Sequence, residues 1–97
     1  MISRTDAQEI AERFIAEQCK TVEGGVMIIQ QRTIERPYGW IFFYNSKRYL
    51  DSGNPLDALG GNGPVVVAQS DGRVTALGTA AEPSASIAEF ERIHALR

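Results

Sequence analysis

Apolar residues follow a helical period near the start of the chain. From Thr5 to about Lys20, apolar side chains recur every three or four positions, which places them on one stripe of a helix. Thr5 followed by Gln8 matches the capping-box pattern of a helix start, and Gly24-Gly25 is expected to end the helix. The stripe consists of Ala7, Ile10, Ala11, Phe14, Ile15 and Val22.

The following segments have the composition of strands. Val26 to about Ile34 is rich in β-branched residues and predicts a strand. Trp40 to Tyr44 gives the strongest strand signal, because it is apolar on both faces, which is typical of a strand inside a sheet. We therefore expect Trp40, Phe42 and Phe43 in the core.

The second half of the chain predicts a hairpin and a closing helix. Val65–Gln69 and Arg73–Leu77 are two short apolar strands, and Ser70-Asp71-Gly72 between them is a good hairpin turn. Ser84 to about Leu96 carries an amphipathic stripe and predicts a helix, with Ser86 opening a second capping-box pattern.

Residues 45–64 are rich in glycine, asparagine and proline and predict a long connection. Loops of about 20 residues exceed the usual length and are often functional. Within it, Pro55–Leu59 could form one helical turn capped by Asn54. Gly61-Asn62-Gly63-Pro64 predicts a tight turn with positive φ at one or more glycines. We expect the leucines of this connection to point inward and its polar residues outward; these leucines are Leu50, Leu56 and Leu59.

These elements predict one α+β domain over residues 1–97. The order is helix, strand, strand, short helical turn, strand, strand, helix. We expect a single, mainly antiparallel, four-stranded sheet flanked by the N-terminal and C-terminal helices, with the Trp40–Tyr44 strand away from the edge. The first helix should pack across one face of the sheet through Ile10, Phe14 and Ile15.

Composition narrows the class of partner. The chain has 97 residues and a formal net charge of −2 from 12 acidic and 10 basic residues, so nucleic acid is not an expected partner. The longest apolar runs are strand-sized, which predicts no membrane span and no signal peptide, and hence a cytoplasmic protein. The single cysteine cannot form an intramolecular disulfide.

Candidate catalytic groups are few. Cys19 and His94 are the only cysteine and histidine, and both fit a packing role better than a nucleophilic dyad. Asp51 and Asp57 match no metal-binding loop and are expected to be solvated. The glycines of 60–63 precede a strand rather than a helix, unlike a phosphate-binding loop. We expect no enzyme activity, no metal and no cofactor.

Contacts with a partner protein are predicted on the long connection. An interface needs a few aromatic or arginine anchors ringed by polar groups. That mixture occurs in Arg48, Tyr49, Asp51, Asn54 and Asp57. A weaker second patch lies on the turn before the central strand and consists of Arg36 and Tyr38.

A series of short motifs in the middle of the chain resembles the immunity protein 35 family, which includes YrhB-type proteins. The series begins with Gly39-Trp40-Ile41-Phe42 and Tyr49-Leu50-Asp51-Ser52-Gly53, and continues with Gly61-Asn62-Gly63-Pro64 and Leu77-Gly78-Thr79-Ala80. The resemblance covers about residues 39–80. Gly60 stands where the family has alanine, a small departure.

The resemblance implies a bacterial immunity protein of a polymorphic-toxin system, which binds and neutralises a cognate toxin encoded beside it. The shared motifs are architectural, so no catalytic residue carries over. The alternative implied by the YrhB-type members is a chaperone-like stress protein that holds unfolded clients on an apolar sheet face. A small enzyme is a distant third reading. The oligomeric state stays open, including a homo-oligomer.

Overall fold

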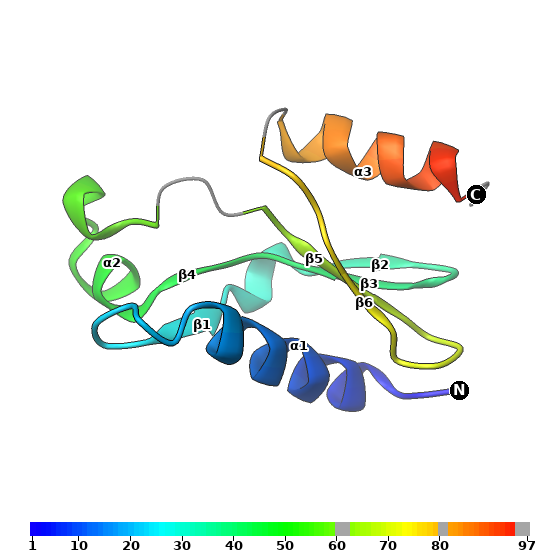
Figure 1. Cartoon of the computed structure of the whole chain (residues 1–97), viewed down its shortest axis with the longest axis horizontal. Coiled ribbons are helices and arrows are strands. Elements are labelled where there is room, and N and C mark those ends of the chain that lie inside the picture. Colours follow the sequence, from blue (N-terminus) through cyan, green and yellow to red (C-terminus); the bar gives the residue numbers. More distant parts are fainter. Residues whose placement is uncertain (60–62, 80–81, 95–97) are drawn as a thin grey trace.

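The computed structural model describes residues 1–59, 63–79 and 82–94. These residues form helices and strands in an α+β arrangement, as predicted (Figure 1). The helical elements are α1 (Arg4–Gln18), η1 (Gln30–Arg32), α2 (Lys47–Ser52), η2 (Pro55–Asp57) and α3 (Pro83–Ile93), where η marks a 3₁₀-helix. The strands are β1 (Val26–Ile28), β2 (Ile34–Arg36), β3 (Gly39–Phe42), β4 (Tyr44–Ser46), β5 (Val65–Ala68) and β6 (Val74–Ala76).

The described strands form two antiparallel sheets, not the single sheet that the sequence predicts. The larger sheet has the order β2-β3-β5-β6, and β1 pairs with β4 in a smaller one. The inner position of β3 is confirmed. The β5–β6 hairpin is also confirmed, with Val65 opposite Ala76 and Val67 opposite Val74.

The second sheet arises because the central strand changes its partners at Phe43. Before this residue β3 pairs with β2 and β5, and after it the chain continues as β4 beside β1. The single strand predicted over 26–34 is therefore two strands separated by η1. The three η1 residues are polar, and the Arg32 guanidinium lies 4.2 Å from the centroid of the Phe43 ring, where a cation–π contact holds the interruption in place.

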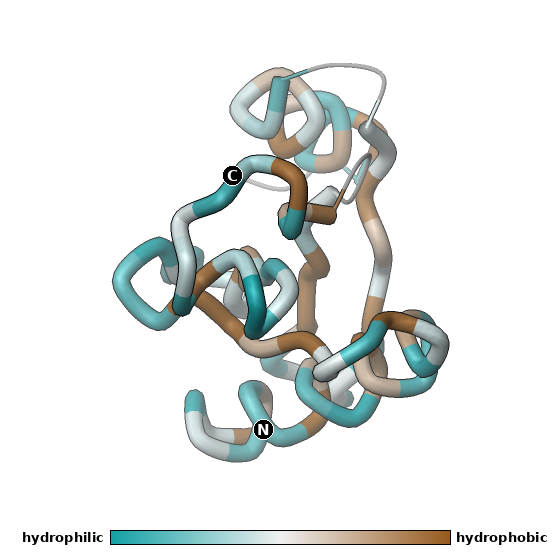
Figure 2. Tube along the Cα trace, turned by 90° about the vertical axis from the view of Figure 1, so that its left-hand side faces the viewer, coloured by the Kyte–Doolittle hydropathy of each residue, from teal (hydrophilic) through white to brown (hydrophobic). Residues whose placement is uncertain are grey.

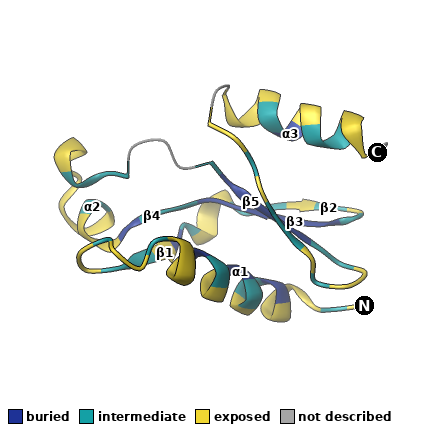
Figure 3. Ribbon diagram, viewed as in Figure 1, coloured by how far each residue is buried: buried dark blue, intermediate teal, exposed yellow. Residues whose placement is uncertain are grey.

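Helices cover both faces of the larger sheet. α1 and α3 lie on opposite sides of β3 and β5 in Figure 1, and the strands between them are the most buried part of the chain (Figure 3). Figure 2 shows hydrophobic stretches of the trace toward the middle of the molecule and hydrophilic turns around the outside. The side chains that alternate along the central strand therefore belong to two separate cores, one on each face of the sheet.

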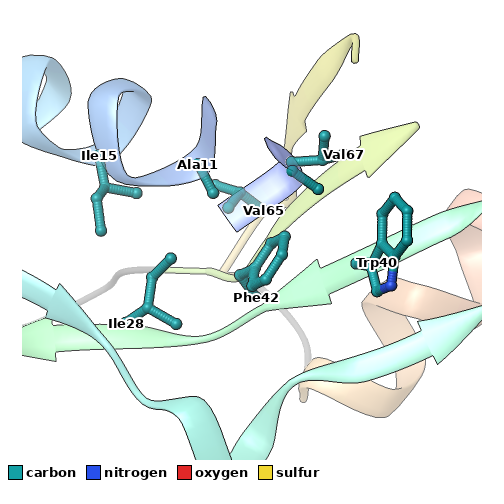
Figure 4. Packing of buried hydrophobic residues seen from close by; sticks show 8 residues of the cluster. Ala11, Ile15, Ile28, Trp40, Phe42, Val65 and Val67 are labelled. Atoms are coloured by element: carbon teal, nitrogen blue, oxygen red, sulfur yellow. The ribbon is translucent and has the colours of Figure 1, made fainter. Parts of the chain in front are cut away.

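The core under α1 is the larger of the two. Ile15 of α1 packs with Phe42 of β3 and Val65 of β5 (Figure 4), and Ile10 and Phe14 contact the same cluster while half-buried. The core under α3 joins Ile87 and the half-buried Phe90 to the opposite face of the sheet. The buried members of that second core are Ile41, Phe43, Val66 and Ile87.

Two helix starts differ from the predicted ones by a few residues. The N-cap of α1 is Ser3, whose Oγ accepts a hydrogen bond from the Asp6 N–H at 3.1 Å, and Asp6 completes the capping box. α1 ends at Gln18, before Gly24-Gly25, which instead lie in the turn that leads to β1. α3 begins with Pro83, since the first turn of a helix tolerates proline. Ser86 therefore lies inside the helix and does not cap it.

The predicted long connection is largely ordered. It contains the end of β4, the helix α2, and η2 at the predicted helical turn, where Asn54 caps the Leu56 N–H. The part of the glycine-rich turn at 60–62 lies outside the described residues.

Two glycines are required because backbones approach each other closely. A Cβ at Gly39 would collide with the Val67 carbonyl of β5, and a Cβ at Gly63 would collide with the Leu77 carbonyl that follows β6. Gly63 does not have a positive φ, and Gly61, the other glycine of the predicted turn, lies outside the described residues. Gly63 is required because its backbone lies close to the segment that follows β6.

Truncation of Ile15 should destabilise the fold more than truncation of Phe14. We expect Ile15→Ala to cost about 2–5 kcal/mol in the free energy of unfolding, because the side chain is buried among both sheets. Phe14→Ala should cost less than the roughly 3–5 kcal/mol of a fully buried phenylalanine, because Phe14 is only half-buried. Urea unfolding measures both, with exposed Glu12→Ala as the control. Equal, small losses for all three variants would contradict this packing.

Addition of one methyl group at Gly63 should also destabilise the fold. The new Cβ of Gly63→Ala meets backbone oxygens that cannot move independently of β6, and forced overpacking costs about 1–3 kcal/mol or more. The matched control is Gly78→Ala, because nothing lies within 4 Å of a Cβ at Gly78. Thermal unfolding of the two variants compares them directly. Equal melting temperatures would show that the strands do not approach at Gly63 as described.

Candidate functional site

The predicted contact residues of the long connection gather on one protrusion, formed by residues 47–57. We call it the α2–η2 protrusion. It lies at one end of the long axis of the molecule, and the N-terminus and the C-terminal end of α3 lie toward the other end (Figure 1). Its residues are mainly exposed (Figure 3). The surface is therefore well separated from the sheet core that stabilises the fold.

Two side chains of β4 fix the protrusion to the sheets. Ser46 is 2% exposed; its Oγ accepts a hydrogen bond from the Tyr49 N–H at 3.1 Å and donates one to the Asp57 carbonyl. The Oδ1 atom of Asn45 accepts hydrogen bonds from the backbone N–H groups of Ser46 and Leu59, both at 2.8 Å. Buried polar groups with satisfied partners favour one conformation, so α2 and η2 are held together at their base.

A second set of polar side chains closes the turn between α2 and η2. The Ser52 hydroxyl donates to the Asp57 carboxylate at 2.9 Å and accepts from the Asn54 N–H at 3.0 Å. Asn54 Oδ1 accepts from the Leu56 N–H at 3.0 Å. Arg48 lies 3.8 Å from the same Asp57 carboxylate and 3.2 Å from Glu23.

The predicted contact residues of the protrusion therefore have different roles in the fold. The Asp57 side chain is only 22% exposed, so it is not the solvated carboxylate that the sequence predicts. Asn54 and Asp57 hold the turn, and Arg48 bridges it to the segment before β1. Asp51 is exposed and makes no hydrogen bond or ion pair within the described chain, and Tyr49 is half-buried.

The leucines of the protrusion point outward, which corrects the inward orientation that the sequence predicts. Leu56 is 91% exposed and Leu50 is also exposed, whereas Leu59 is half-buried. Leu50, exposed Met27 and Asp51 line a hollow of about 330 Å³ beside α2. Hydrophobicity alone assigns leucine to a core, so the sequence analysis missed these residues. The sequence signal for an outward orientation is the neighbouring serines and asparagine, whose side chains accept hydrogen bonds from nearby backbone N–H groups.

The second predicted patch, Arg36 and Tyr38, is occupied by contacts with α3. The Tyr38 hydroxyl donates a hydrogen bond to Glu91 at 2.8 Å, and the Arg36 Nε lies 3.0 Å from the same carboxylate oxygen. The Tyr38 and Phe90 rings lie 5.9 Å apart. Burial and the Glu91 carboxylate raise the pKa of Tyr38 to about 12, so the phenol stays a donor. This patch fixes α3 onto the sheet.

Cys19 follows α1 and His94 follows α3. The two helices lie on opposite sides of β3 and β5 (Figure 1). His94 follows α3 and packs on Phe90, with ring centroids 4.4 Å apart. Cys19 follows α1 next to Tyr44, whose pKa is raised by burial and by that thiol. The two groups therefore do not meet as a dyad.

Among residues 1–59, 63–79 and 82–94, no three histidine, cysteine or acidic side chains gather where they could bind a metal ion. No helix in those ranges is both long and apolar enough to cross a membrane.

Comparison with known proteins identifies the family. No curated protein and no solved structure gives a significant match to the chain. A family model described as immunity protein 35 matches residues 5–92. This match includes most of α1 and of α3 as well as the central motifs whose resemblance the sequence showed. The chain therefore belongs to the immunity protein 35 family.

Proposed function

We propose that this chain binds and neutralises a cognate bacterial protein toxin, and that it does so stoichiometrically rather than by catalysis. The observation that carries the proposal is membership of the immunity protein 35 family over residues 5–92. An immunity protein must present a defined surface to one partner. The α2–η2 protrusion, fixed to the sheets through Asn45 and Ser46, supplies such a surface.

We place the toxin interface on the protrusion. Arg48, Tyr49 and Asp51 supply its polar and aromatic contacts, while Asn54 and Asp57 position the turn. Arg36 and Tyr38 are the less favoured patch, because Glu91 already engages both side chains.

The chaperone-like alternative receives less support from the fold. Client holding needs an open apolar sheet face. Both faces at the centre of the larger sheet pack against helices, α1 on one side and α3 on the other (Figure 1).

Stoichiometric binding can be measured with the toxin domain encoded beside this chain. We expect co-expression to restore growth and the two proteins to elute together as a 1:1 complex. In a titration, the toxin activity should fall to zero at one molar equivalent, because each molecule blocks one toxin. Full inhibition at a small fraction of an equivalent would indicate an enzyme. Suppression of client aggregation on heating, without toxin binding, would favour the chaperone-like alternative.

Protection should not depend on Cys19 or His94. These residues lie apart in the fold, so the double variant Cys19→Ser, His94→Gln should bind the toxin with the parent affinity and protect cells equally. Circular dichroism checks that the variant is folded, and calorimetry measures its affinity. A folded variant that binds the toxin but no longer protects would show that one of these groups takes part in chemistry.

A further inference from the structure

The edge strand β6 leaves backbone hydrogen-bonding groups unpaired. Its two ends are bonded to the β5 side through the Arg73 carbonyl and the Leu77 N–H, both at 2.9 Å. Residues of an antiparallel strand alternate between facing the neighbouring strand and facing away from it. The N–H and C=O groups of Val74 and Ala76 therefore face outward. No hydrogen bond within residues 1–59, 63–79 and 82–94 reaches these four groups.

The opposite edge of the same sheet, at β2, is protected from a further strand. The same alternation makes Glu35 the outward residue of β2. On either side of it, the Thr33 N–H already bonds to the Gln30 carbonyl at 3.2 Å, and Pro37 has no N–H. Charge and proline are common protections of a sheet edge. β6 carries neither, so it is the edge that is ready for pairing.

Two hollows lie beside β6 on the side of α3. Their volumes are about 250 and 380 Å³, and both are lined by Thr75 of β6 and Phe90 of α3. Ile93, which lines the larger hollow, is 62% exposed. Side chains of an added strand would alternate between the two faces of the sheet, so those on this face would lie on the side of Ile93. Free backbone groups and an exposed apolar side chain therefore occur at the same edge.

We propose that β6 pairs with β6 of a second copy of this chain, as an antiparallel pair centred on Thr75. In that register Val74 lies opposite Ala76 of the second copy, and the two residues exchange both N–H···O bonds. A two-fold axis through the centre repeats this pair, so both free donors and both free acceptors of each copy are used. The larger sheet then continues through the dimer, with four strands from each copy.

The side chains of this edge favour a second copy over a foreign strand. Thr75 lies opposite Thr75 of the second copy, and threonine pairs of this kind stabilise sheets. One step outward, Arg73 lies opposite Leu77 of the second copy, which lines the same hollow as Glu89. Arg73 is exposed, and its contact with Asp71 is long at 3.9 Å, so its charge is available to Glu89 of the second copy. The symmetry brings these opposite charges together twice.

The pairing is independent of the proposed function. β6 lies away from α2 and η2 in Figure 1, so the dimer leaves the α2–η2 protrusion of each copy free. Each chain can then still bind one toxin, as the titration requires.

Sedimentation velocity of the isolated chain over a range of concentrations tests the pairing. We expect the mass of a dimer. Ala76→Pro should raise its dissociation constant by roughly tenfold or more, because each copy loses one outward donor and the ring lies where the second strand would pair. The matched control is Glu35→Pro, which places proline at the outward position of β2 and should leave the dimer unchanged. Circular dichroism checks that both variants are folded.

A charge pair on the two-fold axis tests the register. Thr75→Lys and Thr75→Glu each place like charges opposite each other, so each variant alone should be monomeric. An equal mixture should dimerise again, because lysine then faces glutamate, a rescue that damage to the fold cannot produce. A parent that stays monomeric into the millimolar range would overturn the inference. So would folded Thr75 variants that remain dimeric alone, or a mixture that stays monomeric. A dimeric parent that fails to bind the toxin would instead overturn only the proposed function.

Discussion

The close approach of β3 and β5 is the constraint on which the rest of the fold depends. All four residues of β3 are buried, and at Gly39 the two backbones come so near that no side chain fits between them. A strand buried on both faces needs a cover on each side. α1 supplies one cover over Trp40 and Phe42, and α3 supplies the other over Ile41 and Phe43. Both helices therefore pack on residues of this one strand, and each of the two cores includes side chains from it.

The same strand connects this core to the candidate interface. Beyond Phe43 it continues as β4, pairs with β1, and ends at Ser46, whose hydroxyl bonds to both α2 and η2. The protrusion is therefore attached to a continuous run of β structure rather than to a free loop. Rigid attachment lowers the ordering cost of binding, because few backbone torsions remain to be fixed when a partner arrives.

Sequence patterns predicted the elements whose burial follows a simple period. The alternation of Trp40 and Phe42 against Ile41 and Phe43 placed the central strand and its two faces correctly, and the turn at 70–72 located the hairpin. The change of partner at Phe43 was not predictable, because it depends on pairing between distant segments and on the polar interruption at η1. Periodicity describes one strand at a time and carries no information about which strand lies beside it.

The sequence predicts partner contacts on the long connection, and it predicts the wrong orientation for two leucines there, Leu50 and Leu56. These leucines were assigned inward, because hydrophobicity scales treat every leucine as a core residue. In this segment short polar side chains accept hydrogen bonds from backbone N–H groups, as Ser52 does from Asn54 and Asn54 does from Leu56. Sequence reading of such segments therefore improves when side chains that cap the backbone are assigned before the apolar residues are placed.

The exposed Leu56 is separate from the interactions that hold the turn beneath it. An exposed leucine adds almost nothing to the folding free energy, because its surroundings in the folded and unfolded chain are nearly the same. The hydrogen bonds of Ser46 and Asp57 keep the turn in place whichever apolar side chain stands at position 56. The side chain at position 56 can therefore change while the framework beneath it is kept. Specificity for a partner can change at such a residue without loss of the fold.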